Sequence, residues 1–233
     1  MKKKPSKRMK KNNDLVDHGK FYDLKDACAI LKNSKHPKFV ETVDVAIKLG
    51  IDTEKTEQHV RGVVSLPHGI GKKVKVAVFA KGEKLKEAQD AGADIVGGEE
   101  LLESLKDGKI DFARCIATPD IMPAVGKLGQ ILGPKGLMPN PKLGTVTNDV
   151  KQAVKSLKLG QVEFRSEKSG IVHSGVGKID MESKAIEDNI RAFFQAVQKA
   201  KPTSVKGIYI KKVSIATTMG VGIKLNTANL KVA

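Results

Sequence analysis

The sequence predicts a mixed α/β and α+β protein of two domains, in which the middle of the chain is inserted between two ends of another character. Strands and helices alternate over residues 74–159, which is typical of βαβ units that form a parallel sheet covered by helices. Both chain ends instead combine alternating strands with amphipathic helices. We therefore expect an outer domain of residues 1–66 and 160–233 and an inserted domain of residues 67–159.

The charge of the chain supports this division. The 233 residues contain 42 Lys and Arg against 26 Asp and Glu, a net charge of +16, which indicates a polyanionic partner. The expected outer domain holds 27 basic and 15 acidic residues, a net +12, and the expected inserted domain holds 15 and 11, a net +4. The polyanion site is thus expected on the outer domain.

The outer domain begins with a lysine-rich arm. Residues 1–13 contain seven basic and no acidic residues, so we expect a flexible arm that is either merely solvated or binds nucleic acid. Residues 23–33 predict a helix that Asp23 can cap, and residues 41–50 alternate strictly, as in a strand with one face in water. The remaining expected elements are strands at 60–66, 161–166, 170–174 and 208–215 and a helix at 183–200. We expect strands 161–166 and 170–174 to pair through a turn at 167–169.

The inserted domain shows three short apolar strands, each followed by a helical pattern. The expected strands are residues 74–80, 94–98 and 112–117, and the expected helices are residues 83–91, a segment through Leu101, Leu102 and Leu105, a segment after Pro119, and residues 148–159. The short gaps between them predict helices packed on a parallel sheet.

The stretch ILGPKGLMPNP, residues 131–141, has a Gly-Pro-Lys-Gly core that resembles a nucleotide loop at first glance. A phosphate-binding loop requires G-x-x-x-x-G-K followed by Ser or Thr. None of the five Gly-Lys pairs of the chain has glycine five residues earlier or a hydroxyl residue after the lysine. Because prolines fix φ and glycines permit tight turns, we interpret the stretch as a structural turn.

The sequence predicts no catalytic or metal-binding residues and no cofactor. Cys28 and Cys115 lie 87 residues apart in apolar runs, where buried reduced thiols are expected, as in a cytoplasmic protein. No His-x-x-x-His or Cys-x-x-Cys pair occurs. No apolar run of about 20 residues is present, so no membrane partner is expected.

Three blocks of sequence resemble a known family. Residues 126–140, residues 162–178 and the stretch SIATTMG at residues 214–220 are similar to the signatures of the stalk protein family of the large ribosomal subunit, the large-subunit proteins numbered one. The similarity extends from about residue 22 to residue 225. It implies an outer α+β sandwich of the split βαβ type and an inserted Rossmann-like, three-layer α/β domain.

The resemblance also implies a function without catalysis. Such a protein binds large-subunit ribosomal RNA, forms the mobile stalk near the tRNA exit site, assists release of deacylated exit-site tRNA, and represses translation by binding its own operon mRNA. It is a cytoplasmic, ribosome-bound protein and a monomer when free.

The resemblance implies RNA contacts in three segments. The residues are Lys38, Phe39 and Thr42, then Arg165, Lys168 and His173, then Thr218, Met219 and Gly220. Lys and Arg neutralise phosphates, hydroxyl and backbone N–H groups bond RNA oxygens, and Phe or Met packs on sugars.

The chain departs from the family pattern at two places. Val221 stands where the family usually has proline, and Ser174 with Gly175 replaces an Ala-Pro pair. Both changes bear on the rigidity of the loops rather than on the contact residues themselves.

One alternative remains open from the residues themselves. The βαβ alternation of the middle domain also fits a nucleotide-dependent enzyme that a basic outer domain tethers to nucleic acid, because a fold class does not determine a function. RNA binding measured beside ATP and NAD titrations separates the two hypotheses.

Overall fold

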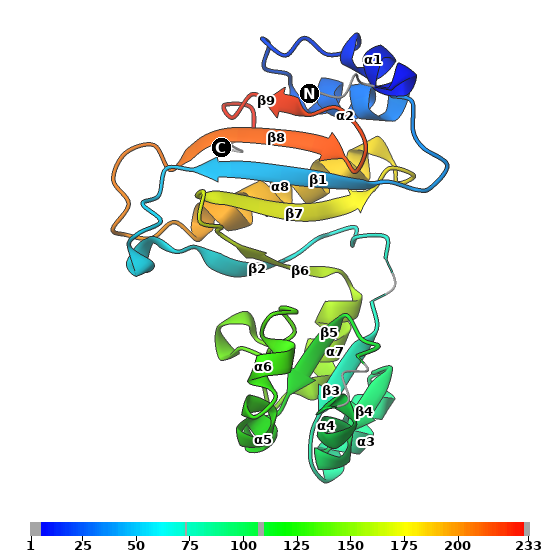
Figure 1. The fold of residues 1–233 in the computed structure, drawn as a ribbon, viewed down its shortest axis with the longest axis vertical. Helices are drawn as coiled ribbons and strands as arrows, with labels where there is room; N and C mark the ends of the chain where they lie inside the picture. The colour runs from blue at the N-terminus through cyan, green and yellow to red at the C-terminus, as the bar shows by residue number, and fades with distance from the viewer. Residues whose placement is uncertain (1–5, 73, 107–109, 231–233) are drawn as a thin grey trace. The chain divides into compact units, whose positions relative to one another are not determined.

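The computed structural model describes residues 6–72, 74–106 and 110–230 and shows several sheets and helices, so the mixed α/β fold class is confirmed (Figure 1). The chain divides into two compact units. The outer unit consists of Met1–Gly71 and Val162–Ala233, and the inserted unit consists of Lys72–Gln161. The boundaries expected from the sequence lay near residues 67 and 160.

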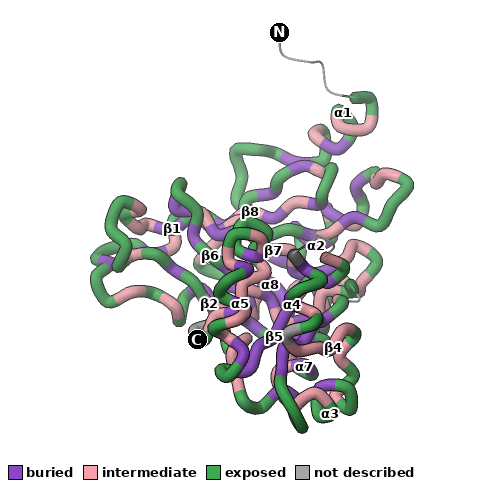
Figure 2. Tube along the Cα trace, turned by 60° about the horizontal axis from the view of Figure 1, so that its bottom comes forward, coloured by how far each residue is buried: buried purple, intermediate pink, exposed green. Residues whose placement is uncertain are grey.

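The outer unit is built on a four-stranded antiparallel sheet of order β7-β1-β8-β9. Its strands are β1 (Thr42–Leu49), β7 (Ile171–Lys178), β8 (Ile210–Thr217) and β9 (Ile223–Leu225). The alternation of β1 is confirmed, because Val43, Val45, Ile47 and Leu49 are all buried. Figure 2 colours the chain by burial. One face of the sheet therefore belongs to the core and the other faces solvent.

Two helices contribute to the core of the outer unit. Helix α8 (Ser183–Lys199) contacts β7 and α2 (Leu24–Asn33). As predicted, one apolar face of each helix is buried, with Leu24, Ala27, Cys28 and Leu31 in α2 and Ile186, Ile190, Phe193 and Val197 in α8. Phe193 packs edge-on against Phe164 with ring centroids 5.7 Å apart.

The predicted pairing of strands 161–166 and 170–174 is confirmed only next to the turn, where Ser166 forms an antiparallel bridge with Val172. The turn between them forms, since Glu167 N donates to Ile171 O at 2.9 Å, but β6 (Gln161–Arg165) pairs with β2 (Arg61–Ser65), whereas β7 pairs with β1. A Cβ on Gly62 would lie 2.6 Å from the Phe164 ring, so the glycine leaves room for that ring beside β2. Strand partners depend on such contacts between distant segments.

The predicted flexible arm is wrong for residues 7–13, which form helix α1 (Lys7–Asn13). The Ser6 hydroxyl accepts from Met9 N at its start. Asn12 is buried and exchanges two hydrogen bonds with the backbone of Lys35, at 3.0 and 2.9 Å. A pattern of lysines cannot reveal this tertiary anchor, and residues 1–5 lie outside the described residues.

The predicted N-cap position of Asp23 is confirmed, but its side chain does not cap the helix. Asp23 occupies the N-cap position of α2 but makes no side-chain capping bond, and its carboxylate accepts from Asn229 Nδ2 at 2.6 Å instead. A short 3-10 helix, η1 (Thr56–Gln58), precedes β2.

The inserted unit contains a parallel sheet of order β4-β3-β5, with β3 (Val76–Phe79) between β4 (Ile95–Gly97) and β5 (Arg114–Ala117). All four β3 residues are buried, because they alternate between two apolar clusters on the two faces of the sheet. The helical segments are α3 (Glu83–Asp90), α4 (Glu99–Lys106), η2 (Pro119–Ile121), α5 (Met122–Gly126), α6 (Gly129–Leu132), η3 (Pro141–Leu143) and α7 (Val150–Lys158).

The stretch at residues 131–141 begins in α6 and continues as a turn. Leu132 is fully buried, Leu137 N donates to Leu132 O at 3.0 Å, and Gly136 has φ +68°. Cys115 Sγ lies 2.6 Å from Leu137 O, so the turn is held against β5. The geometry agrees with a structural role.

The expectation of buried free cysteines is confirmed for Cys28 and Cys115. Burial raises the pKa of each thiol to about 12. Among the described residues, no helix has the length and apolarity needed to cross a membrane.

Candidate RNA-binding surface

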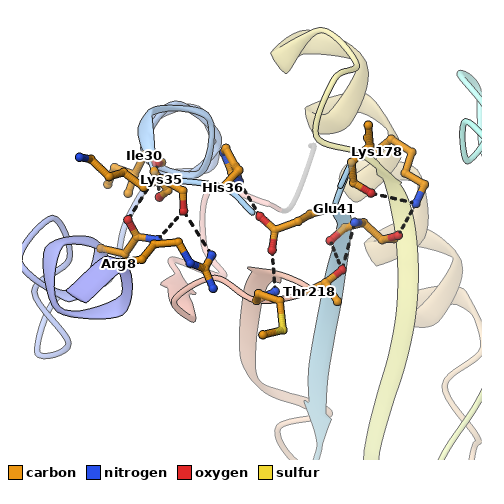
Figure 3. A network of polar contacts seen from close by, with 12 residues as sticks. Arg8, Ile30, Lys35, His36, Glu41, Lys178 and Thr218 are labelled. Atoms are coloured by element: carbon orange, nitrogen blue, oxygen red, sulfur yellow. Dashed lines mark hydrogen bonds and ion pairs between the residues drawn. The ribbon is translucent and has the colours of Figure 1, made fainter. Parts of the chain in front are cut away.

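Two of the three predicted contact segments meet at the start of β1. Thr218 N donates to Thr42 O at 3.1 Å, and Thr42 N donates to the Thr218 hydroxyl at 3.1 Å (Figure 3). Antiparallel pairing places the end of β8 beside the start of β1. Residues 176 positions apart in the sequence thereby form one site.

The side chains at this site face solvent. Lys38 is exposed, and the large apolar side chains of Phe39 and Met219 are each 52% exposed. We call Lys38, Phe39, Thr42, Thr218, Met219 and Gly220 the sheet-end cluster. Exposed apolar groups beside a cation are typical of a binding surface.

A buried carboxylate supports the sheet-end cluster. Glu41 is fully buried, and its two oxygens bond Met219 N at 2.6 Å and His36 Nδ1 at 2.5 Å (Figure 3). It thereby ties the segment before β1 to the loop after β8. Sequence reasoning missed Glu41 and His36, because no local pattern distinguishes Glu41 from a solvated residue at the start of a strand.

Lys178 also reaches the sheet-end cluster from the end of β7. Its Nζ donates to the Thr42 hydroxyl at 2.9 Å and to Val40 O at 3.5 Å. Lys178 is the last residue of the block 162–178, the second of the three blocks that resemble the family. Its place in that block is the signal by which sequence reasoning could have found it. Its charge adds to that of Lys38 at this end of the sheet.

The space beside Thr217 is too small for a side chain at position 220, so this position requires glycine. A Cβ at this position would lie 2.1 Å from the Thr217 hydroxyl, so a larger residue would displace the loop. The neighbouring Val221 is buried in the outer core, where it anchors the loop by packing. Gly175 likewise leaves room for Thr42, whose Cγ2 would lie 3.1 Å from an added Cβ.

The remaining three predicted residues lie around the turn between β6 and β7. Arg165, Lys168 and His173 are exposed around the turn between β6 and β7, and we call them the turn group. His173 pairs with Ala46, four residues along β1 from Thr42, which corresponds to roughly 13 Å. The structure thus divides the nine predicted residues into the sheet-end cluster and the turn group. Within the turn group, Lys168 lies farther from the sheet-end cluster than His173.

An acidic residue lies between the two groups on the solvent-facing side of the sheet. Asp44 pairs with Gly175 on β7 and with Ala216 on β8. Burial raises the pKa of the Asp44 carboxyl, and the nearby positive charges of His173 and Lys178 partly oppose that shift. His173 Nε2 also lies 3.8 Å from a Glu167 oxygen, so the turn group is only moderately electropositive.

A sheet end that presents Lys38 beside the exposed apolar side chains of Phe39 and Met219 is typical of a nucleic-acid-binding protein. No group of three or more His, Cys, Asp or Glu that could hold a metal ion occurs within the described parts of the chain.

Comparison with known families gives the particular assignment. Residues 30–221 match the sequence model of the ribosomal protein L1p/L10e family. The match covers most of the chain, and the chain belongs to this family, which confirms the resemblance seen in the sequence. The family comprises structural, RNA-binding proteins of the large ribosomal subunit rather than enzymes, so the protein is a ribosome-associated protein that binds ribosomal RNA.

Proposed function

We propose that the sheet-end cluster is the centre of ribosomal RNA recognition and that the turn group makes a second, peripheral contact. The observation that carries this proposal is the junction of two exposed segments, one with Lys38 and Phe39 and the other with Met219, which hydrogen bonds between Thr42 and Thr218 tie together. Apolar side chains pack on sugars or bases, and the lysine neutralises a phosphate. A rigid scaffold keeps these groups in place before RNA binds, which lowers the entropic cost of association.

The turn group extends this footprint by charge. Arg165, Lys168 and His173 offer exposed donors to phosphates at a distance of several nucleotides from the sheet-end cluster. We expect these three residues to contribute affinity for any RNA, whereas the sheet-end cluster contributes selectivity.

The finer cellular roles are part of the same proposal. The RNA-bound protein forms the mobile stalk near the tRNA exit site and assists release of deacylated tRNA. It also represses translation of its own operon, since a messenger that folds like the ribosomal site presents the same phosphates and bases to the same surface. The free protein is a cytoplasmic monomer that needs no cofactor.

The decisive experiment is a footprint of the full-length protein on its own large-subunit ribosomal RNA, followed by a salt series of binding constants. We expect one protected site and a linear fall of log affinity with log salt, by about 0.7–0.9 per neutralised phosphate. A protein that protects no discrete site would contradict the proposal.

A shortened chain tests where the site lies. A flexible linker replaces residues 72–160, which leaves the strands and the apolar core of the outer unit. We expect this variant to keep specific RNA binding. Loss of the footprint in a variant that still unfolds cooperatively would show that the inserted unit contributes to recognition.

A further inference from the structure

Helix α1 presents three lysines to solvent beside its anchored side. Arg8 and Asn12 lie one turn apart and both donate to Lys35 O, at 3.3 and 3.0 Å. Lys7, Lys10 and Lys11 are exposed. The helix is thus divided into an anchored side and a basic side.

The anchor is a specific contact, and breaking it costs free energy. The Asn12 side chain is fully buried and uses both its amide nitrogen and its amide oxygen on the Lys35 backbone. An isolated helix of seven residues is unstable in water, so this tertiary contact is what holds α1 in place. Removing one partner of a buried hydrogen bond leaves the other unsatisfied.

The anchor also determines where the basic side lies. Lys35 precedes Lys38 of the sheet-end cluster by three residues, and His36 of the same segment bonds Glu41 beneath that cluster. In Figure 3 the bond of Arg8 to Lys35, the bond of His36 to Glu41 and the bonds of Thr218 lie on neighbouring segments. The charges of α1 are therefore held next to the proposed RNA surface.

The three lysines have no anionic partner among the described residues, and α1 contains no acidic residue. Several other lysines of the chain do form ion pairs. These pairs are Lys20–Asp17, Lys55–Asp52, Lys75–Asp111, Lys84–Asp120 and Lys158–Asp94. The positive field of α1 thus remains available to an external polyanion.

We infer that α1 is a docked phosphate-binding element, in which Lys7, Lys10 and Lys11 extend the RNA footprint beyond the sheet-end cluster. The inference rests on the proposed function, because it assigns to α1 the RNA that the sheet-end cluster recognises. RNA is favoured over an anionic membrane because the chain tethers the helix beside Lys38 through Lys35. The helix also keeps its Met9 side chain packed on the protein core.

The test compares two charge-matched triple variants of the full-length protein on transcribed large-subunit ribosomal RNA. The first changes Lys7, Lys10 and Lys11 to Gln. The control changes Lys86, Lys151 and Lys155 to Gln, which removes three helical lysines of the inserted unit that are also exposed. We expect the first variant to lower the salt slope by about two units and the affinity by about tenfold or more at physiological salt, and the control to leave both unchanged.

A third variant tests docking. Asn12→Ala keeps every charge but removes the two hydrogen bonds that the Asn12 side chain makes with the Lys35 backbone. We expect weaker binding to ribosomal RNA with unchanged binding to a scrambled RNA. Wild-type behaviour of Asn12→Ala would show that the lysines act as a loose arm and would overturn the docked element.

The remaining outcomes are also decisive. Equal salt slopes for the wild type and the α1 triple variant would overturn the inference and leave the proposed function intact. Equal losses of affinity in both triple variants would show that only the net charge of the protein matters, and this result would also overturn the inference. Absence of RNA binding by the wild type would instead overturn the proposed function. If the α1 triple variant alters binding only to phosphatidylserine vesicles, the partner is a membrane surface and the inference is wrong.

Discussion

The carboxylate of Glu41 accepts a hydrogen bond from the backbone nitrogen of Met219 at 2.6 Å, across 178 positions of sequence. Its other oxygen lies 2.5 Å from His36 Nδ1. One buried side chain thus positions two exposed segments that the proposed function assigns to RNA recognition. The consequences can be tested residue by residue.

Glu41→Ala should lose specific RNA affinity. The change removes the acceptor of two part-buried groups, Met219 N and His36 Nδ1, at a cost of about 1–3 kcal/mol for each orphaned group. Glu41→Gln is the matched control, because its amide oxygen can still accept from Met219 N. The measurement is the ratio of affinities for ribosomal and scrambled RNA; an equal ratio in both variants would exclude a positioning role for the carboxylate oxygen.

Lys38→Ala should weaken binding to ribosomal and scrambled RNA alike. The exposed ammonium group is expected to neutralise one phosphate, so its loss should lower the salt slope by about 0.7–0.9. Binding constants over a salt series provide the measurement. A change in specificity at constant slope would mean that Lys38 contacts a base edge instead.

Thr218→Val should weaken RNA binding mainly by destabilising the folded protein rather than by removing a direct contact with RNA. The Thr218 hydroxyl accepts from Thr42 N at 3.1 Å and lies 3.4 Å from Thr42 O, so it closes the junction of β1 and β8. We expect a loss of about 1 kcal/mol in the free energy of unfolding, weaker specific binding and an unchanged salt slope. Unfolding in urea and the same salt series measure the three quantities. Unchanged stability with weaker binding would indicate a direct hydrogen bond to RNA.

Gly220→Ala should displace the loop after β8 and weaken specific binding. The added Cβ would lie 2.1 Å from the Thr217 hydroxyl, which is buried. Gly222→Ala is the control, since an added Cβ there meets nothing within 4 Å. We expect at least a tenfold difference in specific affinity between the two variants, about 1.4 kcal/mol. Similar affinities would show that the loop tolerates the shift.

Asp44→Asn should stabilise the protein at neutral pH. Burial raises the pKa of the Asp44 carboxyl in the folded state, so the folded protein binds this proton more tightly than the unfolded chain. The ionised carboxyl is therefore destabilising. Stability is greatest below the ordinary value of 3.8 and falls as pH rises through the raised folded pKa.

The measurement for Asp44→Asn is urea unfolding between about pH 3.5 and about pH 7. The excess stability of the variant should shrink as the pH falls, because the wild-type carboxyl becomes neutral as well. An excess that grows at low pH would contradict the assigned direction. The variant should also bind RNA more tightly, since a negative charge is removed between Thr42 and His173.

The sequence by itself determined the features that depend on neighbours along the chain. The alternation from Val43 to Leu49 predicted β1, because successive side chains of a strand point to opposite faces. The helical spacing of Ile186, Ile190 and Phe193 predicted α8 and its buried face. The sequence blocks around residues 131–140 and 214–220 were sufficient to identify the family of the protein.

Only the tertiary structure decided the features that depend on distant partners. Strand β6 pairs with β2 rather than with its neighbour β7, and the lysine-rich segment 7–13 is a helix because Asn12 bonds the Lys35 backbone. The same holds for Glu41, whose partners include Met219 N. Hydrogen bonds act over about 3 Å of space regardless of separation along the chain, so local patterns of charge and hydrophobicity cannot reveal them.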